Sequence, residues 1–158
     1  MDAIVLLRED HKTVEKLFKR FEKTGDDDLT ERRAIADEVI VELTVHAWIE
    51  EQVFYPAARE AAPETTDHIL ESIEEHHAVV WMLAELKGMD PSNERFKAKM
   101  TVLMENVRHH VEEEEQDWFP DVRKAMGRNR LTELGDRLEA EKKKAPRDPL
   151  AVPSAESE

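Results

Sequence analysis

Residues 110–120 decide the fold of this chain, and they read HVEEEEQDWFP. A near copy, HAWIEEQVFYP, lies at residues 46–56. In each copy a His is followed four residues later by Glu-Glu-Gln, and then by two aromatic residues and a Pro. A pattern shared over this length between two distant places indicates an internal repeat, so the two halves of the chain can be aligned.

The alignment extends upstream of both copies. Glu-Asp-His at residues 9–11 lies over Glu-Glu-His at residues 74–76, and the apolar residues that follow also coincide. The two His residues of each half are separated by nearly equal distances, and one residue of slack in a connecting loop accounts for the difference. The chain therefore reads as two helical hairpins, at about residues 4–60 and 69–124.

The composition limits the class of protein. A chain of 158 residues with 4 Gly, 40% hydrophobic and 38% charged residues is most simply one mainly helical domain with a substantial core. The absence of Cys excludes disulfides, thiolate metal sites, iron–sulfur clusters and cysteine nucleophiles. A net charge of −14 argues against binding to nucleic acid or an anionic membrane, because phosphate contacts need a basic face. No apolar run approaches the ~20 residues of a membrane span and no signal-like segment is visible, so we expect a cytoplasmic protein.

Apolar residues that recur every three or four positions predict four long helices. Short connections between them favour an all-α fold, an antiparallel up-down-up-down four-helix bundle over residues 1–126. Pro56 falls late in the second helix, so we expect a kink or a helix end between Gln52 and Pro56. A short additional C-terminal helix is predicted at residues 127–145. A disordered tail, rich in Pro and small polar residues, is predicted at residues 146–158.

Six polar residues fall on the apolar faces of the predicted helices. Residues four apart on a helix lie one above the other, so His46 and Glu50 are neighbours in the core, as are His110 and Glu114. Burying such groups unpaired would cost several kcal/mol for each charge, against a total stability of ~5–15 kcal/mol. Metal ions offer the compensation, because imidazole and carboxylate ligands suit first-row metals such as iron, zinc or manganese. The predicted ligands are His11, His46, Glu50, His76, His110 and Glu114.

The number of ligands favours two metal ions. Four His and two Glu would saturate one ion, whereas two ions would each take two His, with both Glu free to bridge at the ~3.5–4 Å spacing of dinuclear sites. A hydroxide or oxide bridge would balance the remaining charge, and open positions could bind a diatomic molecule or peroxide. The alternative is a metal-free bundle with internal His–Glu hydrogen bonds, which four His at repeat-related positions disfavour. Glu51 and Glu115 are either solvated or hydrogen-bonded to a ligand His.

These residues resemble the hemerythrin-like, or HHE cation-binding, family over about residues 4–125. The match consists of an inward His, a His-x-x-x-Glu with a trailing Pro, a Glu-Glu-His, and a second His-x-x-x-Glu with a trailing Pro, in that order. The resemblance implies a four-helix bundle with a non-haem di-iron centre. Its implied ligands are His11 and His46 for one iron, His76 and His110 for the other, and Glu50 and Glu114 as bridges.

The chain departs from the oxygen-carrying hemerythrins at one place. Those proteins have a second His one turn before the position of His76, and this chain has Ser72 there. One ligand fewer leaves the site more open, which disfavours reversible oxygen storage. Water or the hydroxyl of Tyr55 could fill the gap, although on an ideal helix Tyr55 faces away from His46 and would need a kink at Pro56. Ferritin-like di-iron bundles are a weaker match, because none of the four inward His residues has a Glu three residues before it.

The function that follows is a non-haem di-iron protein that binds or reacts with oxygen, peroxide or nitric oxide, for sensing or detoxification. The alternative is an iron-binding or sensing module that acts through a partner protein, with the C-terminal helix and tail as the contact surface. The residues leave open whether the protein is an enzyme that consumes peroxide or nitric oxide, and which protein is its partner.

Overall fold

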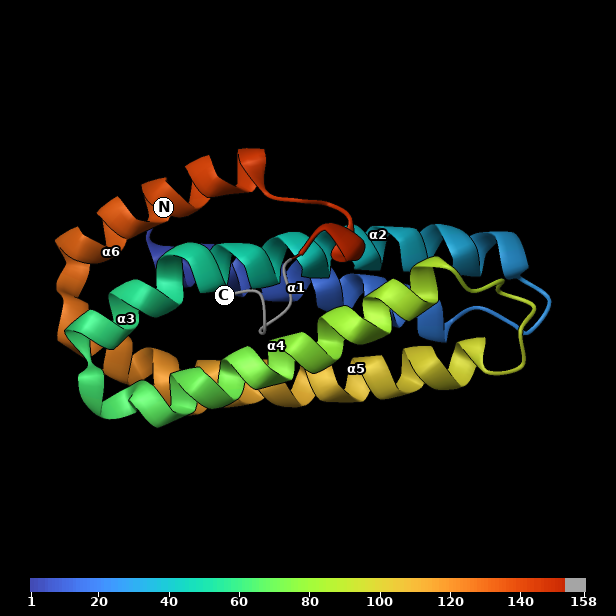
Figure 1. The fold of residues 1–158 in the computed structure, drawn as a ribbon, viewed down its shortest axis with the longest axis horizontal. Helices are drawn as coiled ribbons and strands as arrows, with labels where there is room; N and C mark the ends of the chain where they lie inside the picture. The colour runs from blue at the N-terminus through green and yellow to red at the C-terminus, as the bar shows by residue number, and fades with distance from the viewer. Residues whose placement is uncertain (153–158) are drawn as a thin grey trace.

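The four long helices of the chain form one bundle in a computed structural model that describes residues 1–152. Successive helices run in opposite directions, and each packs against its neighbours around the ring (Figure 1). No strand occurs among residues 1–152, and the predicted all-α, up-down-up-down four-helix bundle is confirmed. The four helices are α1 (Ala3–Glu22), α2 (Leu29–Ile49), α4 (Thr66–Lys87) and α5 (Phe96–Glu113).

Helix α1 illustrates how the local sequence sets an element. Asp2 caps the helix by accepting a hydrogen bond from the backbone N–H of Val5 at 2.9 Å. Lys19 and Arg20 lie in the last turn, where positive charge interacts favourably with the helix dipole. The buried stripe repeats every three or four residues and holds one His among apolar side chains. This stripe includes Ile4, Leu7, His11, Val14 and Phe18.

A polar layer divides the apolar core into two clusters. On α1, Leu7 belongs to one cluster and Val14 to the other, with His11 between them. Helices α2 and α4 repeat this order around His46 and His76, and His110 near the end of α5 lies between Val107 of one cluster and Trp118 of the other, which is in the turn that follows α5. Apolar side chains therefore shield the His layer from water at both ends, which makes an unpaired charge in that layer costly.

Two π-helical turns follow directly on this polar layer. Helix α2 passes through η1 (Glu50–Phe54) into α3 (Tyr55–Ala61), and α5 passes through η3 (Glu114–Trp118) into α6 (Phe119–Lys144). In both, the backbone N–H of the residue before the Pro reaches back five residues for its acceptor. Because Pro has no N–H and its ring clashes with the carbonyl four residues earlier, the turn widens. We predicted a kink or a helix end near Pro56; the structure has a widened turn there, and the helix continues.

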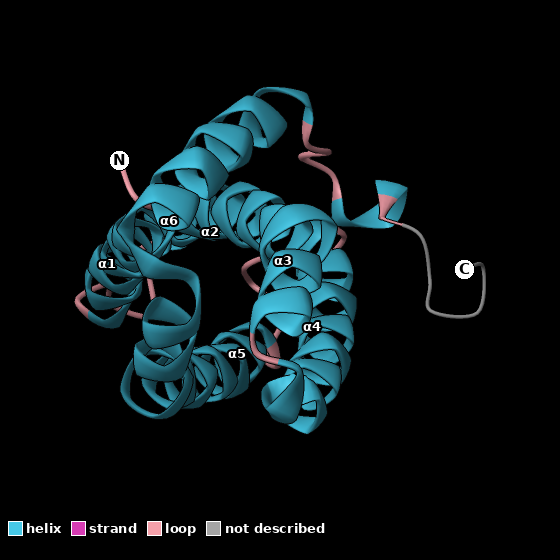
Figure 2. Cartoon of the chain, turned by 90° about the vertical axis from the view of Figure 1, so that its left-hand side faces the viewer, coloured by secondary structure: helices cyan, strands magenta, loops and turns pink. Residues whose placement is uncertain are grey.

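Gly127 redirects α6 over the bundle. Its φ of 78° and ψ of 172° lie in a region that only Gly adopts readily, and the helix bends there. The second half of α6 then packs over α1 and α2 (Figure 1, Figure 2). Gly135 permits this close approach, because a Cβ on Gly135 would lie 1.9 Å from the backbone oxygen of Met1.

The chain beyond α6 also contacts the bundle. Within the span of residues 146–158, where we predicted a disordered tail, a short 3-10 helix, η4 (Pro149–Ala151), packs on α4. An ion pair of 2.6 Å between Lys87 and Asp148 holds it there. The rest of that predicted tail, residues 153–158, lies outside the described residues. Within the described part of the chain, no helix has the length and apolar character needed to span a membrane.

Candidate metal centre

The six predicted ligands converge in the polar layer. Each of the four long helices contributes one His, and the two Glu are the first residues of the π turns. All six side chains are buried, and the two Glu have no exposed surface. Each π turn therefore starts at the residue whose carboxylate enters the centre. The predicted ligands lie as follows: His11 on α1, His46 on α2, His76 on α4, His110 on α5, Glu50 in η1 and Glu114 in η3.

The carboxylate of Glu50 spans the two hairpins. Its Oε1 lies 3.1 Å from Nε2 of His46 in the first hairpin and 3.2 Å from Nε2 of His76 in the second. Both oxygens of Glu50 are buried and accept no hydrogen bond, even though imidazole nitrogens lie so near. Burial of a carboxylate without a hydrogen-bond donor is costly in free energy. A cation between the Glu50 oxygens and the two Nε2 atoms would offset that cost.

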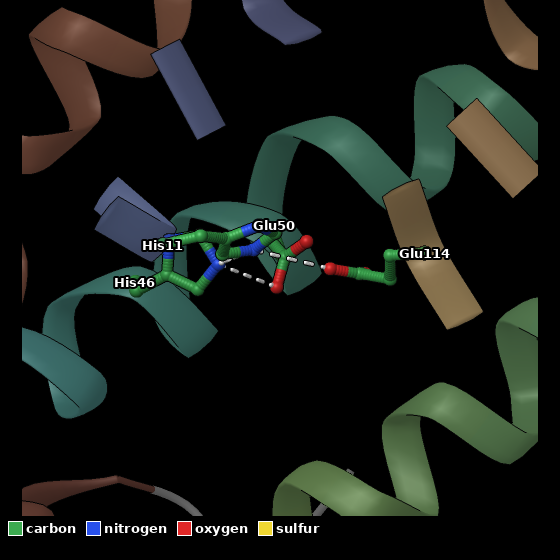
Figure 3. A group of neighbouring side chains, drawn as sticks. All are labelled: His11, His46, Glu50 and Glu114. Carbon is green, nitrogen blue, oxygen red and sulfur yellow. Dashed lines mark hydrogen bonds and ion pairs between the residues drawn. The ribbon is translucent and has the colours of Figure 1, made fainter. Parts of the chain in front are cut away.

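Glu114 repeats this arrangement from the second hairpin. Its Oε1 lies 3.4 Å from Nε2 of His11, and its Oε2 lies 3.3 Å from Nε2 of His110. Figure 3 shows the rings of His11 and His46 side by side, with the carboxylates of Glu50 and Glu114 close to them. The structure therefore has two groups of candidate ligand atoms. Within each group, all the atoms lie within 4.8 Å of one another. The first contains His11, His46, Glu50 and Glu114, and the second contains Glu50, His76 and His110.

An outer ring of carboxylates holds each imidazole in place. The Nδ1 of every ligand His lies 2.6 to 2.9 Å from a carboxylate oxygen of another helix or π turn. A carboxylate can only accept, so Nδ1 carries the proton and Nε2 presents its lone pair to the centre, as a metal ligand must. The pairs are His11 with Glu115, His46 with Asp10, His76 with Glu51, and His110 with Glu75.

This donor set fits first-row metal ions. With neutral imidazoles, the two inner and four outer carboxylates carry six formal negative charges in and around a buried layer. The inner atoms are imidazole nitrogens and carboxylate oxygens, which is the ligand chemistry of iron, zinc and manganese. The Nε2 atoms of His11 and His46 face each other at 3.2 Å as lone-pair acceptors, and a cation beside them removes that repulsion.

Without a metal, the centre attracts protons in its place. Burial alone would lower the pKa of His110, but the charge and hydrogen bond of Glu114 outweigh burial and raise the pKa to about 10. Burial also opposes the charged form of His46, yet the nearby Glu50 and Asp10 raise its pKa well above the usual value. The metal-free centre is therefore expected to hold imidazolium ions at neutral pH.

Raising the pH of the metal-free protein is expected to destabilise it. A His whose pKa is raised by folding adds stability that is fully present below the unfolded value of about 6.5 and is lost as the pH rises towards the folded value. For His110 this window ends at about 10, and each titrating proton costs ~1.4 kcal/mol per pH unit. Thermal melts with chelator present, between pH 6 and pH 9, would measure the effect. A melting temperature that stays constant or rises over that interval would contradict the prediction. Metal-loaded protein is the control, and its melting temperature should change less with pH.

The hydroxyl of Tyr55 also reaches the centre. It donates a 2.8 Å hydrogen bond to Oε2 of Glu114 and lies 3.2 Å from Nε2 of His76. The widened turn of η1 changes the rotation of the helix, which brings Tyr55 inward although it faces outward on an ideal helix. Ser72, buried one turn before His76, is small enough to leave room for the phenol ring. Burial raises the pKa of Tyr55 well above its usual value, and Glu114 raises it further, so the phenol stays protonated without a cation.

The two halves of the centre differ at the position of this phenol. Phe119 occupies the place in the second repeat that Tyr55 occupies in the first. The Phe119 ring stacks on His11 with centroids 6.1 Å apart, as the Tyr55 ring stacks on His76 at 5.4 Å. The repeat thus conserves the packing of an aromatic ring on a ligand His, but only the His76 side receives a hydroxyl group.

Sequence reasoning did not identify two of the four outer carboxylates. Asp10 and Glu75 each precede a ligand His, and their positions in the two repeats coincide. That coincidence is the available signal for an orienting role of these two carboxylates. For Glu51 and Glu115 the sequence allows either solvation or an orienting role, and in the structure each accepts a hydrogen bond from the Nδ1 of a His.

A small cavity borders the His layer. Its volume is about 30 Å³, and its lining combines the four ligand His with apolar side chains that include Val14, Leu43, Val79 and Val107. One water molecule needs roughly 10–15 Å³ of such space. The cavity therefore suits a molecule of about two heavy atoms next to the four imidazoles.

Comparison with known proteins agrees with this geometry. The family described as hemerythrin HHE cation binding domain matches residues 2–122. A crystal structure of an HHE cation binding domain-containing protein from Mycobacterium kansasii superimposes with a TM-score of 0.77 and is 26% identical, covering 91% of this chain and 86% of that one. An uncharacterized protein from Mycobacterium tuberculosis is 29% identical over 144 residues, which is 89% of this chain and 84% of that protein.

A longer relative also matches. A protein named DNA nickase from a Nostoc species is 27% identical over 139 residues, covering 88% of this chain. The match spans only 38% of the length of that relative. The family match extends over most of the chain, and the buried His and Glu clusters lie inside the matched region. This chain is a member of the hemerythrin family, with an HHE cation-binding domain.

Proposed function

We propose that the centre holds two iron ions. One ion is bound by His11 and His46, the other by His76 and His110. The observation that carries this proposal is the position of the two Glu, because each carboxylate lies within 3.4 Å of one His from each pair. Carboxylates in that position would hold both ions, and neither oxygen of Glu50 accepts a hydrogen bond in this structure.

We further propose that the di-iron centre binds and reacts with oxygen, peroxide or nitric oxide, for sensing or detoxification. Bound iron would supply redox chemistry, while the chain orients the imidazoles and excludes water. The cavity of about 30 Å³ beside the four imidazoles supports a diatomic molecule or peroxide as the ligand. Ser72 in place of a further His supports reaction over reversible storage, and the hydroxyl of Tyr55 lies on the same side of the centre, 3.2 Å from Nε2 of His76.

Anaerobic reconstitution with ferrous iron tests this function. We expect two irons for each chain, and a change in the near-ultraviolet and visible spectrum on exposure to oxygen, hydrogen peroxide or nitric oxide. Protein loaded with zinc is the matched control, because zinc takes the same ligands but has no redox chemistry. Two bound irons with an unchanged spectrum and no peroxide consumed would contradict the proposed reaction.

The Tyr55→Phe variant tests the role of the hydroxyl group. Phe at the repeat-related position 119 packs in the same way, so we expect the variant to fold and to bind two irons. Ferric protein should lose any absorption band that arises from a phenolate ligand, and azide should bind about tenfold more tightly at the position thus opened. Visible spectra and azide titrations measure both effects. Unchanged spectra and azide affinity would mean that Tyr55 only donates its hydrogen bond to Glu114.

An iron-responsive module that acts through a partner protein is the second candidate. A contact between α6 and the outer ring favours it, because Lys142 reaches Asp10 on the side of the bundle that α6 covers. Association that changes on iron removal, with negligible peroxide turnover, would support this candidate. The net charge of −14 disfavours binding of this chain to DNA, and the match to the longer relative named DNA nickase spans only 38% of that relative.

A further inference from the structure

A lysine from the last helix reaches the outer ring of the metal centre. Nζ of Lys142 lies 2.5 Å from Oδ1 of Asp10, while Oδ2 of the same carboxylate accepts a 2.9 Å hydrogen bond from Nδ1 of His46. The side chain of Asp10 is 11% exposed and that of Lys142 is 33% exposed. A continuous chain of charge-assisted hydrogen bonds therefore runs from α6 to a ligand of the first metal position.

The fold holds this lysine in place. The bend at Gly127 returns α6 across α1 and α2, and the neighbouring Glu141 accepts a 2.8 Å hydrogen bond from Nε1 of Trp48 on α2. Gly135 allows the same helix to lie against the N-terminus. Lys142 is thus held over Asp10 by the contacts of residues that precede it in α6.

The second half of the centre has no such cation. Glu75 holds His110 as Asp10 holds His46, but within the described residues Glu75 pairs with no Lys or Arg. Helix α3, which corresponds in the repeat to the start of α6, ends at Ala61 and has no segment that could return over the bundle.

The remaining outer carboxylates add to this difference. Glu115, which holds His11 of the first metal position, lies 3.7 Å from Nε of Arg8. Glu51, which holds His76 of the second position, faces no Lys or Arg in the described part of the chain, only His77 at 4.0 Å. Positive charge therefore gathers on one side of the centre, and the phenol of Tyr55 lies on the other.

We propose that Lys142 makes the two metal positions unequal, by neutralising Asp10 and so weakening the electron donation of His46 to the first ion. A carboxylate on the Nδ1–H of a ligand His raises the basicity of that ligand, and a cation on the carboxylate opposes the effect. A nearby positive charge also disfavours the higher oxidation state of an ion. Iron at the first position therefore has the higher reduction potential. The first position also binds a divalent ion less tightly than the second position does. This inference rests on the two-iron centre proposed above.

The Lys142→Met variant tests the inference, with Lys143→Met as the matched control on the exposed side of the same helix. Redox titration of the two-iron protein, followed by electron paramagnetic resonance of the half-reduced form, gives the potentials of the two couples. In Lys142→Met we expect the reduction potential of one of the two iron couples to fall by ~59 mV, which is a change of about tenfold in its equilibrium constant. The potential of the other couple should change little. Equal potentials in wild type, Lys142→Met and Lys143→Met would overturn the inference.

A measurement with zinc separates charge from mere clamping of the helix. Removal of the positive charge should tighten the weaker zinc site of Lys142→Met by about five- to tenfold in competition with a chelator. If Lys142 only fastens α6, the variant should instead bind zinc more weakly and melt at a lower temperature, and the inference would be wrong. Tightened zinc binding in a protein whose iron form shows no response to oxidants would keep this inference and reject the proposed function.

Discussion

Replacing Glu114 with Ala is expected to leave the protein without either metal ion. Its two oxygens lie next to His11 of one pair and His110 of the other, so the substitution removes a ligand from both ions at once. Loss of a bridge also leaves the two ions to repel each other across a buried layer. Elemental analysis of protein purified without chelator, expressed as metal ions for each chain, should fall from about two to nearly zero.

Two further variants make this result interpretable. His46→Ala removes a ligand of one ion only, so it should leave about half of the metal. Glu113→Ala removes the neighbouring carboxylate, whose side chain is 38% exposed, and should leave the metal content unchanged. If Glu114→Ala retains two metals, the carboxylate does not bridge. If wild type, His46→Ala and Glu114→Ala all contain no metal, the bundle is metal-free and its His–Glu pairs are internal ion pairs.

Removing the metal ions is expected to lower the melting temperature by roughly 15–30 °C. A ligand present at a thousand times its dissociation constant stabilises the folded state by about 4.1 kcal/mol, so two such ions contribute about 8 kcal/mol. In domains of 150–250 residues each 1 kcal/mol shifts the melting temperature by about 2–4 °C. The comparison is a thermal melt of metal-loaded protein against the same protein treated with a strong chelator.

The size of this shift distinguishes a metal centre from incidental binding. Restoring iron or zinc should recover the original melting temperature, whereas magnesium, which prefers oxygen ligands, should not. The Glu114→Ala variant serves as the control, because a chelator has no metal to remove from it. A shift of less than a few degrees in wild type would mean that the buried carboxylates are neutralised mainly by imidazolium ions.

Much of the fold was predictable because it depends on local periodicity. The stripe that includes Leu7, His11 and Val14 repeats at helical spacing, and a His on such a stripe must enter the core wherever the helix packs. The internal repeat then determined which polar residues belong together, since two hairpins of the same pattern place corresponding side chains in one layer. The six residues that meet in the centre are the six that the sequence indicated.

Tyr55 shows where helix periodicity fails. An ideal helix directs it away from His46, and only a widened turn, made necessary by Pro56, changes that direction. The sequence indicated some irregularity at this Pro. It did not indicate whether the chain would kink, stop or continue, because those outcomes differ in how the surrounding helices pack.

The sequence by itself determined the all-α bundle, the repeat, and the set of buried His and Glu, since these follow from the spacing of residues along single helices. Only the tertiary structure decided which carboxylate holds which imidazole, because Asp10, Glu51, Glu75 and Glu115 act on helices other than their own. It also decided that Lys142 reaches Asp10, a contact between residues far apart in the chain that depends on the bend at Gly127. Long-range pairings of this kind leave no periodic trace, because they arise from how rigid helices pack and not from any local preference of the chain.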